Sequence, residues 1–292
     1  MALRIGSAIL LAIAATAVAP ARAIAVAPAR IVSLAPAITE TLFALGAGPE
    51  VVGVSEYCDY PDAARRLPTV GSFLTPNVEA IAGLRPTLVI GLESSSNVRP
   101  VRAIEAMGYP TLTVNADTLD EIRTMILKIG ERTGRTNQAD ELVAEIQSHI
   151  DSVRARLKDV PPRKVLMLVG HQPIVAVGPG TYLDELVKLA GGINIADRAA
   201  QEWPRLSIEY IIATAPEVIL DGQMGSDRSV PGGFWSRYPS IPAVRDHRIF
   251  GYPENVMLRP GPRVGMALEM LAAAIHPAEA GSFKLAAPAR NN

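Results

Sequence analysis

Residues 137–157 read NQADELVAEIQSHIDSVRARL, and this stretch decides the fold. Its apolar residues recur at helical spacing along one face, at Leu142, Ile146, Ile150, Val153 and Leu157. Gly134 precedes the stretch, and Pro161 with Pro162 ends it sharply. We therefore predict one helix of about twenty residues, which is comparatively stiff because an α-helix rises about 1.5 Å per residue.

Strand-like and helix-like segments alternate on both sides of this helix. Before it, we expect strands at residues 30–34, 51–54, 87–90 and 111–114, and helices at 39–45, 77–84 and 99–107. After it, we expect strands at residues 164–169, 218–220 and 248–250, and helices at 182–190, 206–213 and 262–275. Such alternation is typical of parallel α/β sheets. The predicted organisation is an N-terminal α/β lobe (24–136), a linking helix (137–160), a C-terminal α/β lobe (161–276) and a disordered tail (277–292).

The N-terminal residues have the pattern of a secretory signal peptide. Arg4 precedes an apolar stretch over residues 5–18, and Ala21-Arg22-Ala23 supplies small residues at the spacing of a cleavage site. The alternative is a membrane anchor, but about fourteen apolar residues are short against the roughly 20 that span a bilayer. We therefore expect residues 1–23 to direct export to the periplasm, with cleavage near Ala23.

Composition excludes several kinds of partner and site. Hydrophobic residues make up 49% of the 292, enough for buried cores, and the formal net charge of −1 gives no field that would recruit nucleic acid. The single cysteine, Cys58, excludes an internal disulfide and any metal site built from several cysteines. The motifs of an exported α/β enzyme, such as a Gly-x-Ser-x-Gly elbow or a phosphate-binding glycine-rich loop, are missing.

Two segments of the chain echo one another. Residues 77–90 read NVEAIAGLRPTLVI and residues 207–220 read SIEYIIATAPEVIL. In each, a glutamate (Glu79 or Glu209) lies in the first turn of a helix that a proline terminates before a buried strand. Interaction with the helix dipole, about 0.3 to 1 kcal/mol, explains one such glutamate. Its recurrence in both halves also allows a role for the two as a pair.

Taken together, several motifs resemble the periplasmic cobalamin-binding proteins of the helical-backbone class, which are related to haem-binding and ferric-siderophore-binding proteins. The resemblance runs from about residue 30 to residue 275. It rests on RIVSLAP at residues 30–36 with Thr39 and Glu40, VGV at 52–54, YCDYP at 57–61, the segment 77–90, GGIN at 191–194, and Trp203-Pro204 followed by Ser207-Ile208-Glu209.

This resemblance implies two Rossmann-like lobes joined by one long rigid α-helix, with a ligand cleft between the lobes. It implies a monomeric binding protein, without catalytic chemistry or a cofactor of its own, that delivers cargo to the permease dimer of an ABC importer. By motif position, Glu79 and Glu209 would dock onto arginines of that permease. Two like charges at fixed spacing suit a rigid protein that meets a two-fold partner.

For the cargo, the resemblance implies cobalamin or cobinamide, with haem or a ferric siderophore as alternatives. Aromatic side chains at Tyr57, Phe73 and Trp203 stand where the family lines its cleft, with Tyr60 nearby, and flat rings suit the broad apolar face of a corrin or porphyrin. Core packing is the alternative for each ring. Phe73 departs from the tryptophan common in the cobalamin proteins.

Residues 169–173, VGHQP, also depart from the family pattern and contain His171 directly after a predicted strand. An imidazole there could coordinate a haem iron or corrinoid cobalt, opposite Tyr57 or Tyr60, or it could be an ordinary loop histidine.

Four arginines near the predicted cleft could bind a propionate, phosphate or carboxylate, or simply be solvated: Arg228, Arg237, Arg259 and Arg263. The remaining histidines share no metal-binding spacing, and we assign no role to them: His149, His247 and His276.

Overall fold

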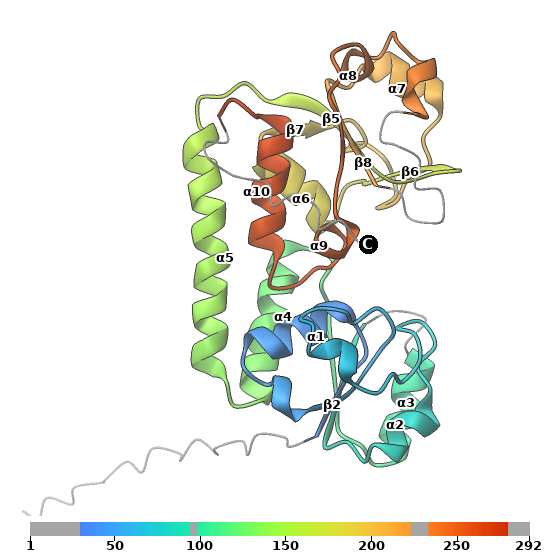
Figure 1. Ribbon diagram of the computed structural model, residues 1–292, viewed down its shortest axis with the longest axis vertical. Coiled ribbons are helices and arrows are strands. Elements are labelled where there is room, and N and C mark those ends of the chain that lie inside the picture. The colour runs from blue at the N-terminus through green and yellow to red at the C-terminus, as the bar shows by residue number, and fades with distance from the viewer. Residues whose placement is uncertain (1–29, 94–97, 223–232, 280–292) are drawn as a thin grey trace, which may run out of the picture.

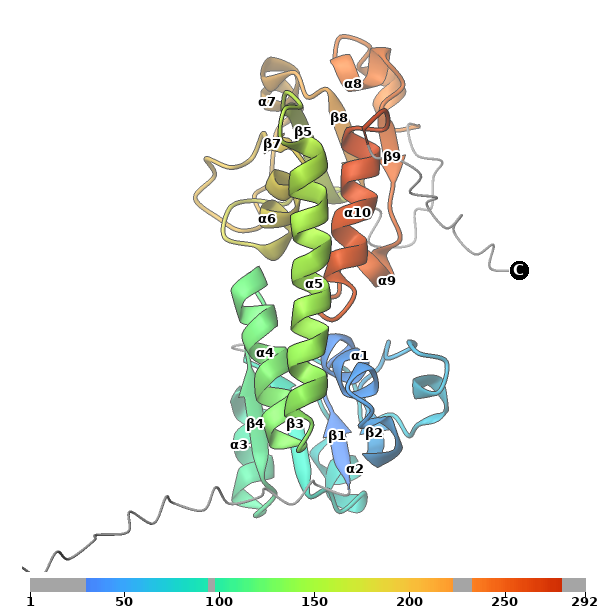
Figure 2. The ribbon, with the colours of Figure 1, turned by 90° about the vertical axis from the view of Figure 1, so that its left-hand side faces the viewer.

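The computed structural model describes residues 30–93, 98–222 and 233–279. Two α/β lobes lie one above the other, and the helix α5 (Thr136–Leu157) runs along one side of both (Figure 1). Figure 2 shows α5 from that side, packed on α4 (Leu119–Arg132) in the lower lobe and on α10 (Val264–Ile275) in the upper lobe. The predicted signal peptide and cleavage at Ala23 lie outside the described residues, as do Arg228 and most of the predicted tail.

The N-terminal lobe is built on a four-stranded parallel sheet with the strand order β2-β1-β3-β4. Its strands are β1 (Ile31–Ser33), β2 (Val51–Val54), β3 (Leu88–Leu92) and β4 (Thr111–Val114). Its helices are α1 (Pro36–Ala44), α2 (Val78–Gly83), α3 (Val98–Ala106) and α4. The central strands are apolar and buried because helices cover both faces of a parallel sheet.

The C-terminal lobe is built on a sheet whose central strand is β5 (Arg163–His171). The other strands are β6 (Ile174–Ala176), β7 (Gly192–Asn194), β8 (Val218–Asp221) and β9 (Ile249–Gly251). The helices are α6 (Tyr182–Leu189), α7 (Ile208–Thr214), α8 (Pro242–Arg245), α9 (Glu254–Met257) and α10. β6 pairs with β5 in antiparallel orientation, while β7 and β8 pair with it in parallel.

The two lobes repeat one topology. Leaving out β6, the order β7-β5-β8-β9 in the C-terminal lobe corresponds to β2-β1-β3-β4 in the N-terminal lobe, and every neighbouring pair is parallel. In both sheets the first and third strands of the chain order lie at the centre, so the order of strands reverses between them as in doubly wound α/β folds. The predicted fold class, two α/β lobes with parallel sheets and a long helix beside them, is confirmed.

The echo between residues 77–90 and 207–220 is structural, and corresponding positions are 130 residues apart. The side chain of Asn77 accepts a hydrogen bond from the amide of Ala80 at the start of α2, and Ser207 does the same for Tyr210 at the start of α7. Each helix is followed by a residue in the left-handed region, Arg85 with φ 47° and Ala215 with φ 51°. A proline and then the central strand, β3 or β8, come next.

The backbone conformation at the ends of these two helices can be tested by substitution. Replacing Ala215 with glycine should stabilise the protein by about 0.5 to 1 kcal/mol, since a side chain at positive φ costs about 1 to 2 kcal/mol and glycine escapes that cost. Urea unfolding of both proteins measures the difference. Ala213→Gly, two residues earlier and inside the right-handed helix, should destabilise by about 1 kcal/mol. An Ala215→Gly variant no more stable than the wild type would contradict the prediction.

Several predicted boundaries need correction. The first helix begins at Pro36, because proline fits the first helical turn, and the helix predicted from residue 206 begins only after its capping residue Ser207. The strand predicted at 164–169 continues to His171 and turns back into β6, which the sequence analysis missed together with β7. Three-residue strands carry too little periodic pattern to be recognised.

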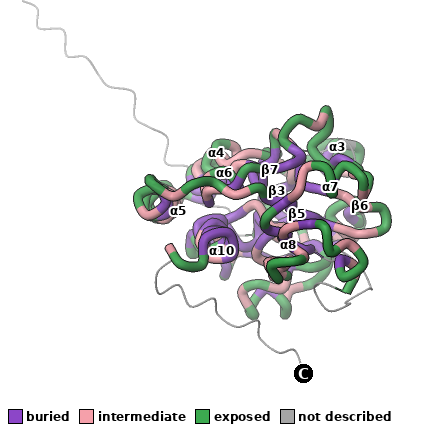
Figure 3. Tube along the Cα trace, turned by 90° about the horizontal axis from the view of Figure 1, so that it is seen from above, coloured by how far each residue is buried: buried purple, intermediate pink, exposed green. Residues whose placement is uncertain are grey.

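The predicted apolar face of α5 is only partly covered. Val153 and Leu157 are buried, whereas Leu142, Ile146 and Ile150 are half-buried. Figure 3 shows that most of α5 is exposed or half-buried, in contrast to α10, which is mainly buried. One hydrophobic cluster nonetheless runs from β1 and α1 through α4 and α5 to β5, α6 and α10, so both lobes contribute to it.

Candidate functional site

A cavity of about 390 Å³ lies between the lobes. Residues from both lobes line it: Ala116 and Asp117 after β4, Val169 and Val175 on β5 and β6, Thr181, Tyr182, Glu202, Trp203, Leu258 and Pro260. Its wall is mostly apolar, and its volume falls in the range of about 300 to 1,000 Å³ typical of small-molecule sites. Two acidic residues, Asp117 from the N-terminal lobe and Glu202 from the C-terminal lobe, are among the residues that line the cavity.

Trp203 is the one predicted ligand residue that lines this cavity, and 42% of it is exposed. Backbone bonds attach its segment to the sheet: the amide of Ala176 donates to Pro204 O at 2.9 Å, and the amide of Gly178 donates to Glu202 O at 2.7 Å. A Cβ on Gly178 would lie 2.4 Å from Gln201 O, so only glycine allows this close approach. Trp203 is thus presented from a fixed loop.

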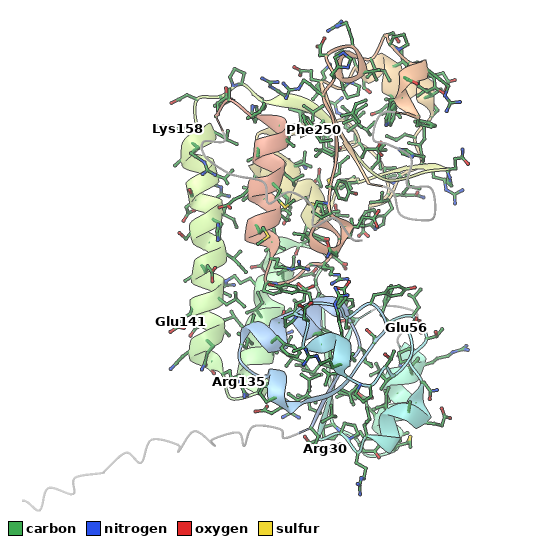
Figure 4. All side chains as sticks on the ribbon, viewed as in Figure 1. Arg30, Glu56, Arg135, Glu141, Lys158 and Phe250 are labelled. Carbon is green, nitrogen blue, oxygen red and sulfur yellow. The ribbon has the colours of Figure 1, made fainter. Side chains whose placement is uncertain are left out.

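The other predicted aromatic residues lie in the N-terminal lobe, in the connection between β2 and α2. Tyr57 is 72% exposed with φ 67°, Tyr60 and Phe73 are also exposed, and the guanidinium of Arg263 lies 4.3 Å from the Tyr60 ring centroid. Core packing therefore does not account for these rings. They do not line the 390 Å³ cavity, and their role as ligand contacts stays a prediction. Figure 4 labels Glu56, the residue before Tyr57, on the side of this lobe opposite α5.

His171 ends β5 and is tied to neighbouring side chains. A register shift between Leu168 and Gly170 lets its ring lie 2.6 Å from Asp221, measured from Nε2 to Oδ1, and stack on Phe234 at 4.9 Å. Trp235 donates from Nε1 to the other carboxylate oxygen at 3.1 Å. Burial raises the pKa of Asp221, and the charge of His171 only partly offsets this.

This position bears on the predicted axial-ligand role of His171. Val169, two residues earlier, lines the cavity, whereas the His171 ring packs with Phe234 and Trp235 beside the second hydrophobic cluster of the lobe. The Nε2 atom is paired with Asp221, which leaves only Nδ1 for any coordination. The described geometry therefore gives His171 a clear structural role in the C-terminal lobe.

Two of the predicted ligand-binding arginines are engaged with protein carboxylates. Arg263 binds both oxygens of Glu40, at 2.8 and 2.6 Å, and Arg259 binds Glu40 at 3.1 Å and Asp59 at 2.5 Å. Burial raises the pKa of Asp59, but the hydrogen bond and charge of Arg259 together with the charge of Arg65 outweigh it and hold the pKa below its usual range. Arg237 lies over the rings of Phe234 and Tyr238.

At Asp117, which lines the cavity, burial and the nearby charge of Glu121 raise the pKa of the carboxyl group. Among the described residues that line this cavity, none is a cation. The polar side of the site is therefore acidic.

Glu79 and Glu209 are both exposed, in the first turns of α2 and α7. Within the described residues neither makes an ion pair or a side-chain hydrogen bond. Both helices lie on the side of the molecule away from α5 (Figure 1), one in each lobe. Within the described residues, the structure thus presents two unpaired carboxylates at corresponding positions of the two lobes, while their docking role stays a prediction.

The roles of Glu40 and Asp221 were not predicted from the sequence. Glu40 was noted only as part of a family motif, although a buried glutamate on an apolar helix needs a cationic partner. Asp221 ends an apolar strand, and its burial depends on Trp235 and His171, which come from distant positions in the chain. Two of the remaining histidines have structural contacts, with His149 on Glu269 at 2.5 Å and His276 on Gly191 O at 3.1 Å.

Two α/β lobes of the same topology, one rigid helix beside them and a cavity between them define a two-lobed ligand-binding protein. The sequence profile of the family described as "Periplasmic binding protein" matches residues 31–256, and the chain belongs to that family. The predictions of a binding protein rather than an enzyme are thereby confirmed.

Three relatives show the range of ligands among similar proteins. The vitamin B12-binding protein of Yersinia pestis is 29% identical over 233 residues, covering 80% of this chain and 81% of that protein. The structure of the periplasmic vitamin B12 binding protein BtuF of Vibrio cholerae has a TM-score of 0.73 at 26% identity, covering 85% of this chain and 96% of that one. The periplasmic heme-binding protein RhuT of Roseiflexus sp. RS-1, in apo form, has a TM-score of 0.76 at 33% identity, covering 85% and 98%.

No group of three or more His, Cys, Asp or Glu side chains among the described residues could hold a metal ion. Within the same residues, no helix is long and apolar enough to cross a membrane.

Proposed function

We propose that this protein is the periplasmic substrate-binding component of an ABC importer and that its cargo is a corrinoid, cobalamin or cobinamide. Residues 1–23 would export it, and the mature protein would act as a monomer. The observation that carries the proposal is the combination of exposed aromatic rings on both lobes with an acidic cavity between them.

The aromatic rings suit a broad, flat ligand. Tyr57 and Phe73 belong to the N-terminal lobe and Trp203 to the C-terminal lobe, and all three are exposed. A macrocycle held between the lobes would bury rings from both lobes with little loss of rotamer freedom. This supports a tetrapyrrole-like ligand over a small polar solute.

The charges favour a corrinoid over haem. Haem carries two propionates, which need cations, whereas the periphery of a corrinoid consists largely of neutral amides that can donate to carboxylates. Asp117 and Glu202 line the cavity, and the nearby Arg259 and Arg263 are engaged with Glu40 and Asp59. Propionates would be repelled at such a site, while amide groups would find acceptors.

Haem is the second candidate, and two observations favour it. The heme-binding protein RhuT is 33% identical, above the 26% of the vitamin B12 binding protein BtuF of Vibrio cholerae. The exposed phenol of Tyr57 also supplies an oxygen of the type that ligates haem iron in some proteins. A ferric siderophore has no comparable observation in its favour and serves as a further arm of the experiment.

For delivery, we propose that Glu79 and Glu209 dock onto the permease dimer. The two carboxylates are exposed, unpaired within the described residues and related by the repeat of the two lobes. If each half of a two-fold permease dimer carries positive charge at the same position, one glutamate from each lobe can contact each half.

The experiment is a titration of the purified mature protein with cyanocobalamin, cobinamide, haemin and a ferric hydroxamate, following tryptophan fluorescence and the absorption spectrum of each ligand. Saturable one-to-one binding of a corrinoid, with haemin at least tenfold weaker, is expected. Saturable haemin binding with a shifted Soret band that Tyr57→Phe abolishes would replace corrinoid with haem. Binding of none of the four would overturn both candidates.

A further inference from the structure

Two arginines of the C-terminal lobe converge on one buried glutamate of the N-terminal lobe. Glu40 lies on α1. Its carboxylate oxygens accept hydrogen bonds from Arg263 at 2.8 and 2.6 Å and from Arg259 at 3.1 Å. Both arginines come from the loop between α9 and α10. Gly261, between them, approaches α1 so closely that a Cβ there would lie 3.3 Å from Ala37 O. The lobes are therefore joined at this point by contacts as well as by the chain.

Besides Glu40, Arg259 contacts the segment that contains Tyr57. Its Nη2 donates to Tyr57 O at 2.9 Å, and its Nη1 donates to the carboxylate of Asp59 at 2.5 Å. We call residues 56–60 the aromatic arm. Arg263 touches the arm only through the face of the Tyr60 ring. The backbone of Tyr57 is thus fixed by a side chain of the other lobe.

The conformation of Tyr57 calls for such an anchor. Its φ of 67° lies in the left-handed region, which a residue other than glycine adopts only where its surroundings fix the backbone firmly. The side chain of Tyr57 is exposed and cannot hold itself in place by packing. Arg259, only 12% exposed and held by two carboxylates, supplies the fixed donor.

We propose that Arg259, braced by Glu40, is a positioning residue that holds the aromatic arm ready for the ligand from the opposite lobe. Neither side chain lines the described cavity, so each acts through the arm. Loss of the anchor should loosen the arm first and weaken ligand binding as a consequence. The second effect, on the ligand, rests on the proposed function, whereas the first does not.

The chain contains its own reporter for the first effect. Cys58, its single cysteine, lies in the arm between Tyr57 and Asp59, is buried, and has its Sγ 3.2 Å from Thr39 Oγ1 and 3.4 Å from Ser55 Oγ. Burial raises the pKa of the Cys58 thiol, more than its hydrogen bonds lower it, so the closed arm should react slowly with a thiol reagent. Reaction requires the arm to open.

The first measurement is the rate at which 5,5′-dithiobis(2-nitrobenzoate) labels Cys58 in ligand-free protein. Arg259→Lys keeps the positive charge but loses the planar fork, and Glu40→Gln removes the brace. Each should raise the labelling rate about tenfold or more, because Arg259→Lys loses the forked hydrogen bonds to Tyr57 O and Asp59, and Glu40→Gln removes the charge that holds Arg259 in place. Glu50→Gln is the control for loss of an ion pair elsewhere in the lobe, since Glu50 forms a partly buried ion pair with Arg135 at 2.5 Å, away from the arm.

The second measurement is the dissociation constant of each variant for cobinamide, or for whichever of the four titrated ligands the wild type binds. Arg259→Lys should weaken binding about tenfold or more, and Glu50→Gln should leave it unchanged. Arg263→Lys, which keeps a cation on Glu40 and never touched the Tyr57 backbone, should have the smaller effect in both measurements.

Either of two results would overturn the inference: a folded Arg259→Lys variant whose Cys58 is labelled at the wild-type rate, or one whose labelling accelerates while its affinity stays the same. If Arg259→Lys is recovered unfolded, Asp59→Asn tests the same anchor, because it removes the negative charge from one contact of Arg259 with the arm and leaves Glu40 paired. If the wild-type protein binds none of the four ligands, the proposed function is refuted. The labelling rates still decide whether Arg259 anchors the arm.

Discussion

Uptake should be abolished when Glu79 and Glu209 are both changed to lysine, while the affinity for the ligand stays at its wild-type value. Both carboxylates are exposed, and the side chains of Asn77 and Ser207 cap their helices independently of them. Reversal should therefore leave the fold intact. Each lysine would place like charges at the docking surface, which costs several kcal/mol and lowers docking by a factor of about a thousand or more.

The measurement is ligand uptake by proteoliposomes or cells that contain the cognate permease, beside a titration of the purified variant. Each single variant should retain partial uptake, because one lobe can still dock. The matched control is Glu131→Lys with Glu141→Lys, which changes the net charge equally at exposed positions on α4 and α5. Figure 4 labels Glu141 on the opposite side of the molecule from α2 and α7. Normal uptake by the Glu79/Glu209 variant, or a loss of ligand affinity, would refute the docking assignment.

Replacing Trp203 with alanine should weaken ligand binding by about fiftyfold, since removing some 100 Å² of buried apolar contact at about 25 cal/mol per Å² costs about 2.5 kcal/mol. The side chain lines the cavity and is attached to β6 by backbone bonds, so its removal should change the site and little else. Trp203→Phe should recover part of the loss, because a smaller flat ring remains.

Binding in this series must be followed through the ligand's absorption spectrum. The chain contains only one other tryptophan, Trp235, which is buried and bonded to Asp221. Removing Trp203 therefore removes the fluorescence signal nearest the cavity. Phe73→Ala gives the comparison within the N-terminal lobe. Unchanged affinity in Trp203→Ala would remove this residue from the site and with it the main support for a flat macrocyclic ligand.

Much of the fold could be predicted from the sequence because its main elements carry strong local signals. The long helix was placed within one residue of its start, since Gly134 and Pro161 bound a clear apolar periodicity. The strands β6 and β7 were not predicted, because three residues show no period and their pairing with β5 is set by distant parts of the chain. Tertiary contacts decide such short strands.

For the candidate site, the type of each residue predicted whether its side chain is exposed better than it predicted which side chains it contacts. The rings of Tyr57, Tyr60, Phe73 and Trp203 are all exposed, yet only Trp203 lines the described cavity. The sequence shows no carboxylate partner for Arg259 or Arg263, but the fold brings Glu40 to them from a position more than two hundred residues away. Spacing along the chain contains no information on such pairs.

The largest hydrophobic cluster does not stop at the boundary between the lobes. It joins β1, α1 and α4 to β5, α6 and α10, and α5 packs against both halves of it. Melting one lobe would strip apolar cover from the other, so neither can lose its packing alone at low cost. The lobes look like two domains in outline, but we expect them to unfold in a single cooperative transition, because they share this cluster.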